Sequence, residues 1–259
     1  HARDKVSWLN NLKPDQQFDY AIFGSSRAFF NLNPQQIKTE TGLNGINLAY
    51  PASDNFEIKL MVKQFLKHQK TKKIFIQVDD RYNSEQVNAT AIVPWLPYIR
   101  ENSIYREIHS VDPTAFYYKY VPFYRYMMND SKLGFREIVM CFTKPNKFEK
   151  TNGFTPLNGE MKNDKSFTFE LEDTSNKHLD AIIEICKKEE IELHFFTAPY
   201  YKTRFNAEVL SKHLPNYHDF SGSISDKDCF RDVSHLNKKG TEKFTSLFSN
   251  IYFKNVVNP

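Results

Sequence analysis

Phe-Asp-Tyr-Ala-Ile-Phe-Gly-Ser-Ser-Arg, residues 18–27, is the stretch from which the architecture can be read. Its first six residues form a short apolar run that stops at Gly24, a pattern typical of a buried strand. A serine on a tight turn from a strand into a helix is exposed, and the amides that follow it can bind an oxyanion. The stretch therefore predicts a strand that carries Ser26 to the edge of a sheet, although Gly-Ser-Ser by itself is also a common loop sequence.

The same alternation of strand and helix continues after this stretch. Helices are expected to begin at Asn33-Pro34 and at Asp54, because Asn and Asp cap helices and Pro suits the first helical position. Strands are expected at residues 45–50 and 74–78. Strands that alternate with helices in this way run parallel and are joined by crossover helices.

The alternation resumes in the C-terminal third of the chain, where the periodicity predicts the following elements: an amphipathic helix at 176–189, a strand at 191–197, a helix at 202–214, an extended segment at 217–220 and a last helix at 238–252. The pattern indicates an α/β fold, a flavodoxin-like three-layer sandwich with a parallel sheet. We expect residues 1–259 to form one domain.

Residues 84–172 interrupt the alternation and are expected to form a mostly helical, aromatic-rich insertion that packs over one end of the sheet. Its aromatic side chains include Trp95, Tyr98, Tyr105 and those within 116–124. They can serve as the core of the insertion, or as a wall for a sugar or an acyl chain, since aromatic rings offer large flat contact surfaces.

The composition excludes several classes of protein. Hydrophobic residues make up 40% and charged residues 25% of the 259 residues, which is typical of a globular chain and not of a disordered, collagen or coiled-coil one. Lys and Arg (35) are mixed with Asp and Glu (31) along the chain, so no nucleic-acid partner is expected. The three cysteines lack metal-ligand spacing and no glycine-rich nucleotide motif is present, so we expect no metal and no cofactor.

A second motif that can carry chemistry is Asp232-Val-Ser-His235, directly before the last predicted helix. An Asp three residues ahead of a His can hold one imidazole nitrogen, which leaves the other nitrogen free to take a proton from a serine. The alternative is a helix cap beside a surface histidine. Together with Ser26 at the end of the first strand, the motif predicts a Ser-His-Asp site at the carboxyl edge of the sheet.

With these two motifs the chain resembles the SGNH (GDSL-type) hydrolase superfamily. Gly24-Ser25-Ser26-Arg27 is similar to the family's first motif, with Ser25 in the place of Asp, and residues 232–240 are similar to its last. The resemblance covers about residues 15–84 and 175–253, and it is closest to members that act on the bacterial cell surface beside membrane-bound O-acyltransferases. It implies that Ser26 is the nucleophile, His235 the general base and Asp232 the acid that orients it.

The family's two middle motifs are not matched. Its glycine after the second strand falls near Ala52 and Ser53, whose amides are the expected substitutes, and its Gly-x-Asn-Asp falls at 78–83, where Asn83 is the only asparagine. Arg27 or Arg81 could instead supply positive charge. Tyr201, after the fourth predicted strand, is either a substrate contact or an ordinary loop residue.

The resemblance implies a serine-dependent O-acyl esterase or acyltransferase that acts through an acyl-enzyme on a cell-surface polysaccharide, with O-acetyl as the expected group. A membrane-bound O-acyltransferase is the expected partner. The expected location is the periplasm or cell surface, with a membrane anchor ahead of His1. The alternatives are a catalytically weak or inactive glycan-binding module of the same fold and an ordinary soluble esterase.

Overall fold

The structure is a computed structural model that describes residues 4–14, 16–129, 133, 139–140, 142–143, 148–162 and 164–254. Its helices and strands, in chain order, are α1 (Lys5–Asn10), β1 (Tyr20–Phe23), α2 (Ser26–Asn31), α3 (Pro34–Thr41), β2 (Gly45–Asn47), α4 (Asn55–His68), β3 (Lys73–Gln77), η1 (Val93–Tyr98), α5 (Asn102–His109), α6 (Ala115–Tyr120), α7 (Tyr124–Met128), α10 (Phe148–Thr151), β4 (Phe167–Thr168), α11 (Lys177–Lys188), β5 (Glu192–Thr197), β6 (Thr203–Arg204), α12 (Glu208–His213), β7 (Tyr217–Asp219), η2 (Lys227–Cys229) and α13 (Lys238–Tyr252).

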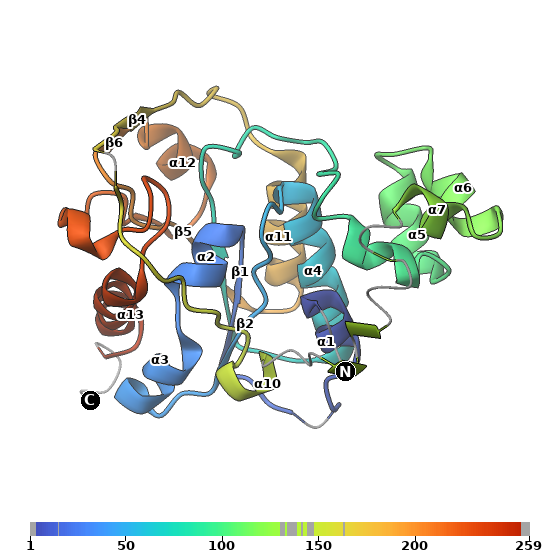
Figure 1. Ribbon diagram of the computed structural model, residues 1–259, viewed down its shortest axis with the longest axis horizontal. Coiled ribbons are helices and arrows are strands. Elements are labelled where there is room, and N and C mark those ends of the chain that lie inside the picture. Colours follow the sequence, from blue (N-terminus) through green and yellow to red (C-terminus); the bar gives the residue numbers. More distant parts are fainter. Residues whose placement is uncertain are drawn as a thin grey trace.

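A parallel five-stranded sheet lies at the centre of the molecule, with the strand order β2-β1-β3-β5-β7 (Figure 1). β1 pairs with β2 on one side and with β3 on the other, so that Tyr20 lies opposite both Gly45 and Lys73. A Cβ on Gly45 would lie 1.9 Å from the Tyr20 ring, which explains the glycine at the start of β2. This strand order is that of flavodoxin-like doubly wound sheets, and the predicted fold class is confirmed.

Helices cover both faces of the sheet and make the fold three-layered. α3 and α13 pack together on one face, and α4 and α11 pack together on the other, with α1 against α4 (Figure 1). Every residue of β1 is buried, as expected for a parallel strand with helices on both sides. Among the described helices, none has the length and apolar character needed to cross a bilayer.

The predicted helix starts are confirmed, and two predicted boundaries are not. Asn33, Asp54 and Asn176 are the N-cap residues of α3, α4 and α11. β2 ends at Asn47, although the chain as far as Tyr50 still donates hydrogen bonds to β1 and Gly24. The helix expected at 202–214 is only α12, because residues 203–204 form β6 and pair with β4 of the insertion.

The insertion contradicts part of the expectation for it. Its first half, which contains α5, α6 and α7, lies on the outer side of α4 and not over the end of the sheet (Figure 1). Ion pairs from Lys59 and Lys67 on α4 to Glu107 and Glu101 hold α5 there. α10 and the residues directly after it do lie beside β2 at the sheet edge, where the Asn152 side chain donates to the Gly45 carbonyl at 2.9 Å (Figure 1).

Candidate active site

Ser26 is the first residue of α2 and follows the carboxyl end of β1 through two residues with special roles. Gly24 has a φ of +149°, and a Cβ at this position would lie 2.7 Å from the Gln77 side chain. Only glycine therefore lets the chain turn this close to β3. Ser25 is the N-cap residue of α2, and together the two residues present Ser26 at the sheet edge where the sequence analysis expected it.

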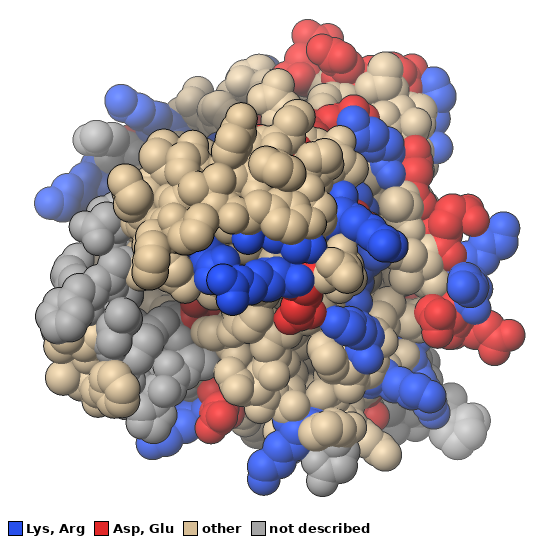
Figure 2. Space-filling view, turned by 90° about the vertical axis from the view of Figure 1, so that its right-hand side faces the viewer, with Lys and Arg blue, Asp and Glu red and all other residues tan. Residues whose placement is uncertain are grey.

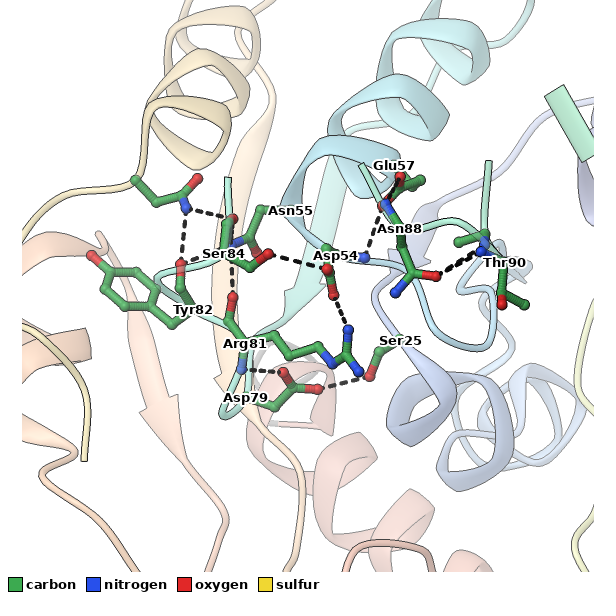
Figure 3. A network of polar contacts seen from close by, with 12 residues as sticks. Ser25, Asp54, Asn55, Glu57, Asp79, Arg81, Tyr82, Ser84, Asn88 and Thr90 are labelled. Atoms are coloured by element: carbon green, nitrogen blue, oxygen red, sulfur yellow. Dashed lines mark hydrogen bonds and ion pairs between the residues drawn. The ribbon is translucent and has the colours of Figure 1, made fainter. Parts of the chain in front are cut away.

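A buried polar network fixes the start of α2 to the end of β3 (Figure 3). The Ser25 hydroxyl lies 2.8 Å from Asp79 Oδ2, and the Ser25 amide donates to Gln77 Oε1 at 3.0 Å. The Gln77 amide group donates to Asp79 Oδ2, and the Arg81 backbone N–H donates to Asp79 Oδ1, both at 3.0 Å. The network orients the turn that carries Ser26. The sequence analysis named Ser25 only as the residue in the place of Asp in the first motif and missed Gln77, although a glutamine at the end of a buried strand was an available signal.

Ser26, His235 and Asp232 come together in a continuous hydrogen-bonded chain. The Ser26 Oγ lies 2.7 Å from His235 Nε2. On the other side of the ring, His235 Nδ1 lies 2.9 Å from Asp232 Oδ1 and 3.1 Å from Oδ2. With Nδ1 donating to the carboxylate, Nε2 is the acceptor for the serine proton. The arrangement has the geometry that the sequence analysis expected of a nucleophile, a base and an orienting acid.

The surroundings of the Asp232 carboxylate keep it ionised. Partial burial on its own would raise the pKa of this carboxyl, but hydrogen bonds from His235 and from the Ser234 amide outweigh it and lower the pKa to about 2. The Ser234 and His235 amides donate to Oδ1 at 2.9 and 3.0 Å, so the loop 232–235 wraps around this oxygen. The carboxylate is therefore negative at any pH at which an imidazole can act as a base.

Contacts with α2 set the position of the His235 loop. The Leu236 amide donates to the Asn31 side chain at 3.2 Å, and the Thr241 hydroxyl donates to the Phe30 carbonyl at 3.1 Å. Gly240 lets α13 approach the loop, because a Cβ there would lie 2.1 Å from the Cys229 carbonyl oxygen. His235 and Ser26 are thus held by one connected piece of structure although they lie far apart in the sequence.

Arg27 was expected to place positive charge at the site. In the structure, most of its guanidinium is bound by backbone carbonyl groups. The side chain is only 2% exposed and stacks on the Tyr200 ring at 3.3 Å. Nη2 donates to the carbonyls of Ala198 and Pro199, and Nε donates to the Ser234 carbonyl. Arg27 therefore joins the loop after β5 to the loop that carries His235.

The two expected amide donors after β2 differ in the structure. The Ser53 amide donates to the Tyr50 carbonyl at 3.2 Å, so the expectation that it binds an oxyanion is corrected. Ala52 has a φ of +63°, the left-handed conformation that suits a glycine. Within the described part of the chain, neither the Ala52 nor the Ser26 amide donates a hydrogen bond. These two amides remain candidates to bind an oxyanion.

The three remaining site residues named in the sequence analysis, Asn83, Tyr201 and Arg81, differ in their surroundings. Asn83 is committed to structure, because its side chain both donates to and accepts from the backbone of Glu172, which corrects its expected role. Tyr201 is buried against the Phe230 ring and supports the His235 loop through its amide. Arg81 pairs with Asp54 at 2.8 Å, and its side chain stays 49% exposed, so it is still available to a substrate (Figure 3).

Among the described residues, one group of side chains has ligand atoms close enough together to hold a metal ion. The ligand atoms of Asp226, Asp228 and Cys229 lie within 4.8 Å of one another. Both carboxylates already form ion pairs, Asp226 with Lys243 and Asp228 with Lys239. The lysines balance the charge of this acidic group.

Comparisons with known proteins add little to this geometry. No family model and no curated protein matches the chain. Among solved structures, it is similar to one described as a gut microbial diltiazem-metabolizing enzyme, with 10% sequence identity and a TM-score of 0.35. The match covers 92% of this chain and 48% of that chain, so this chain spans about half the length of that enzyme.

Proposed function

We propose that this protein is a serine-dependent acyl-ester hydrolase or acyltransferase. The observation that carries the proposal is the chain of short contacts from Ser26 Oγ to His235 Nε2 (2.7 Å) and from His235 Nδ1 to Asp232 (2.9 Å). A serine hydroxyl is a weak nucleophile unless a base takes its proton, and the imidazole is placed to do so.

The reaction follows from these positions. Ser26 Oγ attacks the ester carbonyl carbon while its proton passes to His235 Nε2, and Asp232 stabilises the imidazolium that forms. When the tetrahedral intermediate collapses, His235 returns the proton to the leaving alkoxide, and the acyl group stays on Ser26. A water molecule or a sugar hydroxyl then attacks the acyl-enzyme with His235 as base, which releases the acid or transfers the acyl group.

The charge on the carbonyl oxygen needs hydrogen-bond donors. The Ser26 and Ala52 amides are the two that this proposal assigns to it, since neither is used elsewhere among the described residues. The residues after β3 supply no asparagine donor of the kind found in the family that the chain resembles, because the Asn83 amide group already donates to the Glu172 carbonyl. Each missing donor costs on the order of 10²–10³ in rate, so we expect a slow enzyme.

The finer assignment rests on the sequence resemblance. It favours an O-acetyl or related acyl group on a cell-surface polysaccharide as the substrate. It also favours a location outside the cytoplasm and a membrane-bound O-acyltransferase as the partner. The competing possibility is a glycan-binding module of the same fold that has lost its activity, and the incomplete set of oxyanion donors is the observation in its favour.

The test is incubation with p-nitrophenyl acetate, followed by intact mass spectrometry. We expect a gain of about 42 Da on Ser26, the mass of one acetyl group, together with slow release of nitrophenol. Ser26→Ala should abolish both. Asp232→Asn should lower the rate by up to about 10⁴-fold, because the imidazole is then held in the wrong tautomer.

Two results would count against the proposal. Hydrolysis by Ser26→Ala at the parent rate would show that Ser26 is only a turn residue. A parent protein that is neither acetylated nor active, yet is retained by an acylated polysaccharide, would favour the glycan-binding module.

A further inference from the structure

Exposed apolar side chains gather on α6, α7 and the turn between them. Phe123 and Met127 are each 75% exposed. In the part of the chain that the structure describes, every large apolar side chain that is exposed lies between residues 116 and 142. We call the best-defined group the aromatic platform; it consists of Phe116, Tyr117, Tyr120, Val121, Phe123, Tyr126, Met127 and Met128. A contiguous exposed apolar area of this kind marks an interaction surface.

The charges on the aromatic platform have one sign. Residues 113–129 contain Lys119 and Arg125 and no acidic residue. Lys119 lies over the Tyr105 ring at 4.1 Å and Arg125 over the Tyr126 ring at 4.8 Å, and no described carboxylate pairs with either. Figure 2 faces this side of the molecule and shows a broad uncharged area with Lys and Arg side chains directly below it and Asp and Glu side chains also at its border. The surface is therefore apolar and cationic together.

The backbone at the tip of the platform is strained. Phe123, the N-cap residue of α7, has a φ of +60°, which a bulky residue rarely adopts. The conformation is unfavourable relative to the ordinary regions. In water, this backbone conformation exposes the Phe123 ring to solvent. Against an apolar phase, the same conformation would let the ring be buried.

The platform is fixed by contacts to the neighbouring helices and lies away from Ser26. The Lys119 ammonium donates to the Asn102 side chain at 2.8 Å, and the Tyr105 and Tyr120 rings meet edge to face, so α6 is fixed to α5. Ion pairs then fix α5 to α4, as described above. Figure 1 shows α6 and α7 at the right-hand end of the molecule, beyond α4, whereas α2 lies near its middle. The aromatic side chains of α6 and α7 therefore form no wall for a substrate at Ser26, which corrects that expectation.

We propose that the aromatic platform docks on the surface of an anionic lipid bilayer. The rings of Phe116 and Phe123 and the methionine side chains would enter the interface, and the tyrosines, with one apolar and one polar end, suit the headgroup level. Lys119 and Arg125 would contact lipid phosphates. A projecting tip with aromatic, methionine and basic side chains fits a fluid anionic surface, as amphipathic interfacial helices do.

The test is co-flotation of the full chain with lipid vesicles. We expect binding to vesicles of phosphatidylcholine mixed with phosphatidylglycerol, and weaker binding to phosphatidylcholine alone. The double variant Phe123→Ser/Met127→Ser should bind at least about tenfold more weakly, because two exposed apolar groups are lost from the interface. Lys119→Gln/Arg125→Gln should bind the anionic vesicles roughly thirtyfold more weakly.

Two controls separate this proposal from its rivals. Lys187→Gln/Lys188→Gln removes the same charge from two exposed lysines at the end of α11 and should leave vesicle binding unchanged. Ser26→Ala should also bind as the parent does, since the docking does not depend on ester chemistry. Circular dichroism of every variant checks that the fold is kept.

Three outcomes would overturn the proposal. The first is a parent protein that stays with the free fraction, which leaves a protein partner as the ligand of the platform. The second is an equal loss on changing Lys187 and Lys188, which means that net charge alone drives binding. The third is a parent that dimerises in analytical ultracentrifugation through Phe123 and Met127 without binding vesicles, which assigns the platform to a second copy of the chain.

Discussion

Ala52 holds the left-handed conformation at the turn after β2, beside the edge of the sheet that carries Ser26. An L-residue with a Cβ pays about 1–2 kcal/mol for this conformation, and glycine does not. The backbone at this position thus has a conformation suited to glycine although the residue is alanine. The shape matters because it leaves the Ala52 amide without a partner among the described residues.

The replacement Ala52→Gly should therefore stabilise the fold. The relief of strain exceeds the extra entropy of glycine in the unfolded chain, so we expect the free energy of unfolding to rise by about 0.5–1 kcal/mol. Urea unfolding measures the change. Ala49→Gly, at a buried position without a positive φ, is the matched control and should destabilise. Equal losses in both variants would show that the Ala52 conformation stores no strain.

At the level of single residues, the sequence predicted which residues form the site better than it predicted the contacts around them. Ser26, Asp232 and His235 could be singled out because their residue types and their places beside predicted elements carry chemistry. The burial of the Arg27 guanidinium under Tyr200 could not be predicted. It depends on where the loops after β1 and β5 meet, and a sequence pattern does not record such a meeting.

Among the elements, α2 begins with Ser26, the proposed nucleophile, and is only six residues long. Such a short helix has little stability of its own, so contacts outside it must set its direction. The Ser25 hydroxyl is one of these contacts, because it donates to the buried Asp79 carboxylate at 2.8 Å.

Ser25→Ala and Ser26→Ala should affect different properties although the two serines are adjacent. Removal of the Ser25 hydroxyl takes a donor from a buried carboxylate, so we expect the free energy of unfolding to fall by about 1–3 kcal/mol. Ser26→Ala should abolish ester hydrolysis and change stability little. Urea unfolding and p-nitrophenyl acetate hydrolysis on both variants give the comparison. A Ser25→Ala protein as stable as the parent would show that the network is not needed to dock α2.

The elements themselves were largely predictable because their signals are local. Capping residues marked the starts of α3, α4 and α11, and apolar runs marked β1, β3 and β5. The exceptions depend on distant parts of the chain. β6 exists because β4 of the insertion pairs with it, and neither two-residue strand has a periodicity of its own to reveal it.

For the whole molecule, one buried carboxyl group links folding to pH. Glu57 in α4 is 2% exposed and accepts hydrogen bonds from the Asp54 and Asn88 amides at 3.0 and 2.8 Å. Burial raises the pKa of this carboxyl to about 8, and the nearby Asp54 charge adds to the rise against the effect of these amides. The folded chain therefore keeps a proton that the unfolded chain loses above a pH of about 4.5.

The sign of the pH effect follows from this difference. Below about pH 4.5 both states are protonated at Glu57, and between that pH and about 8 the folded state binds more protons. The free energy of unfolding should thus fall as pH rises through this window, by at most about 1.4 kcal/mol per pH unit from this group. Glu57→Gln removes the titration. Urea unfolding of both proteins at pH 5 and pH 8 should show a steeper loss in the parent, and parallel profiles would contradict the assignment.

The distance between the two halves of the site along the chain has a consequence for synthesis. Ser26 and His235 are 209 residues apart in sequence. At a translation rate of about 5–20 residues per second, the ribosome makes the base roughly 10–40 s after the nucleophile. Until α13 has emerged and packs on α2, Ser26 has no imidazole beside it, so under the proposed function the nascent chain cannot attack esters. The onset of the proposed ester chemistry would then report that α13 has packed on α2.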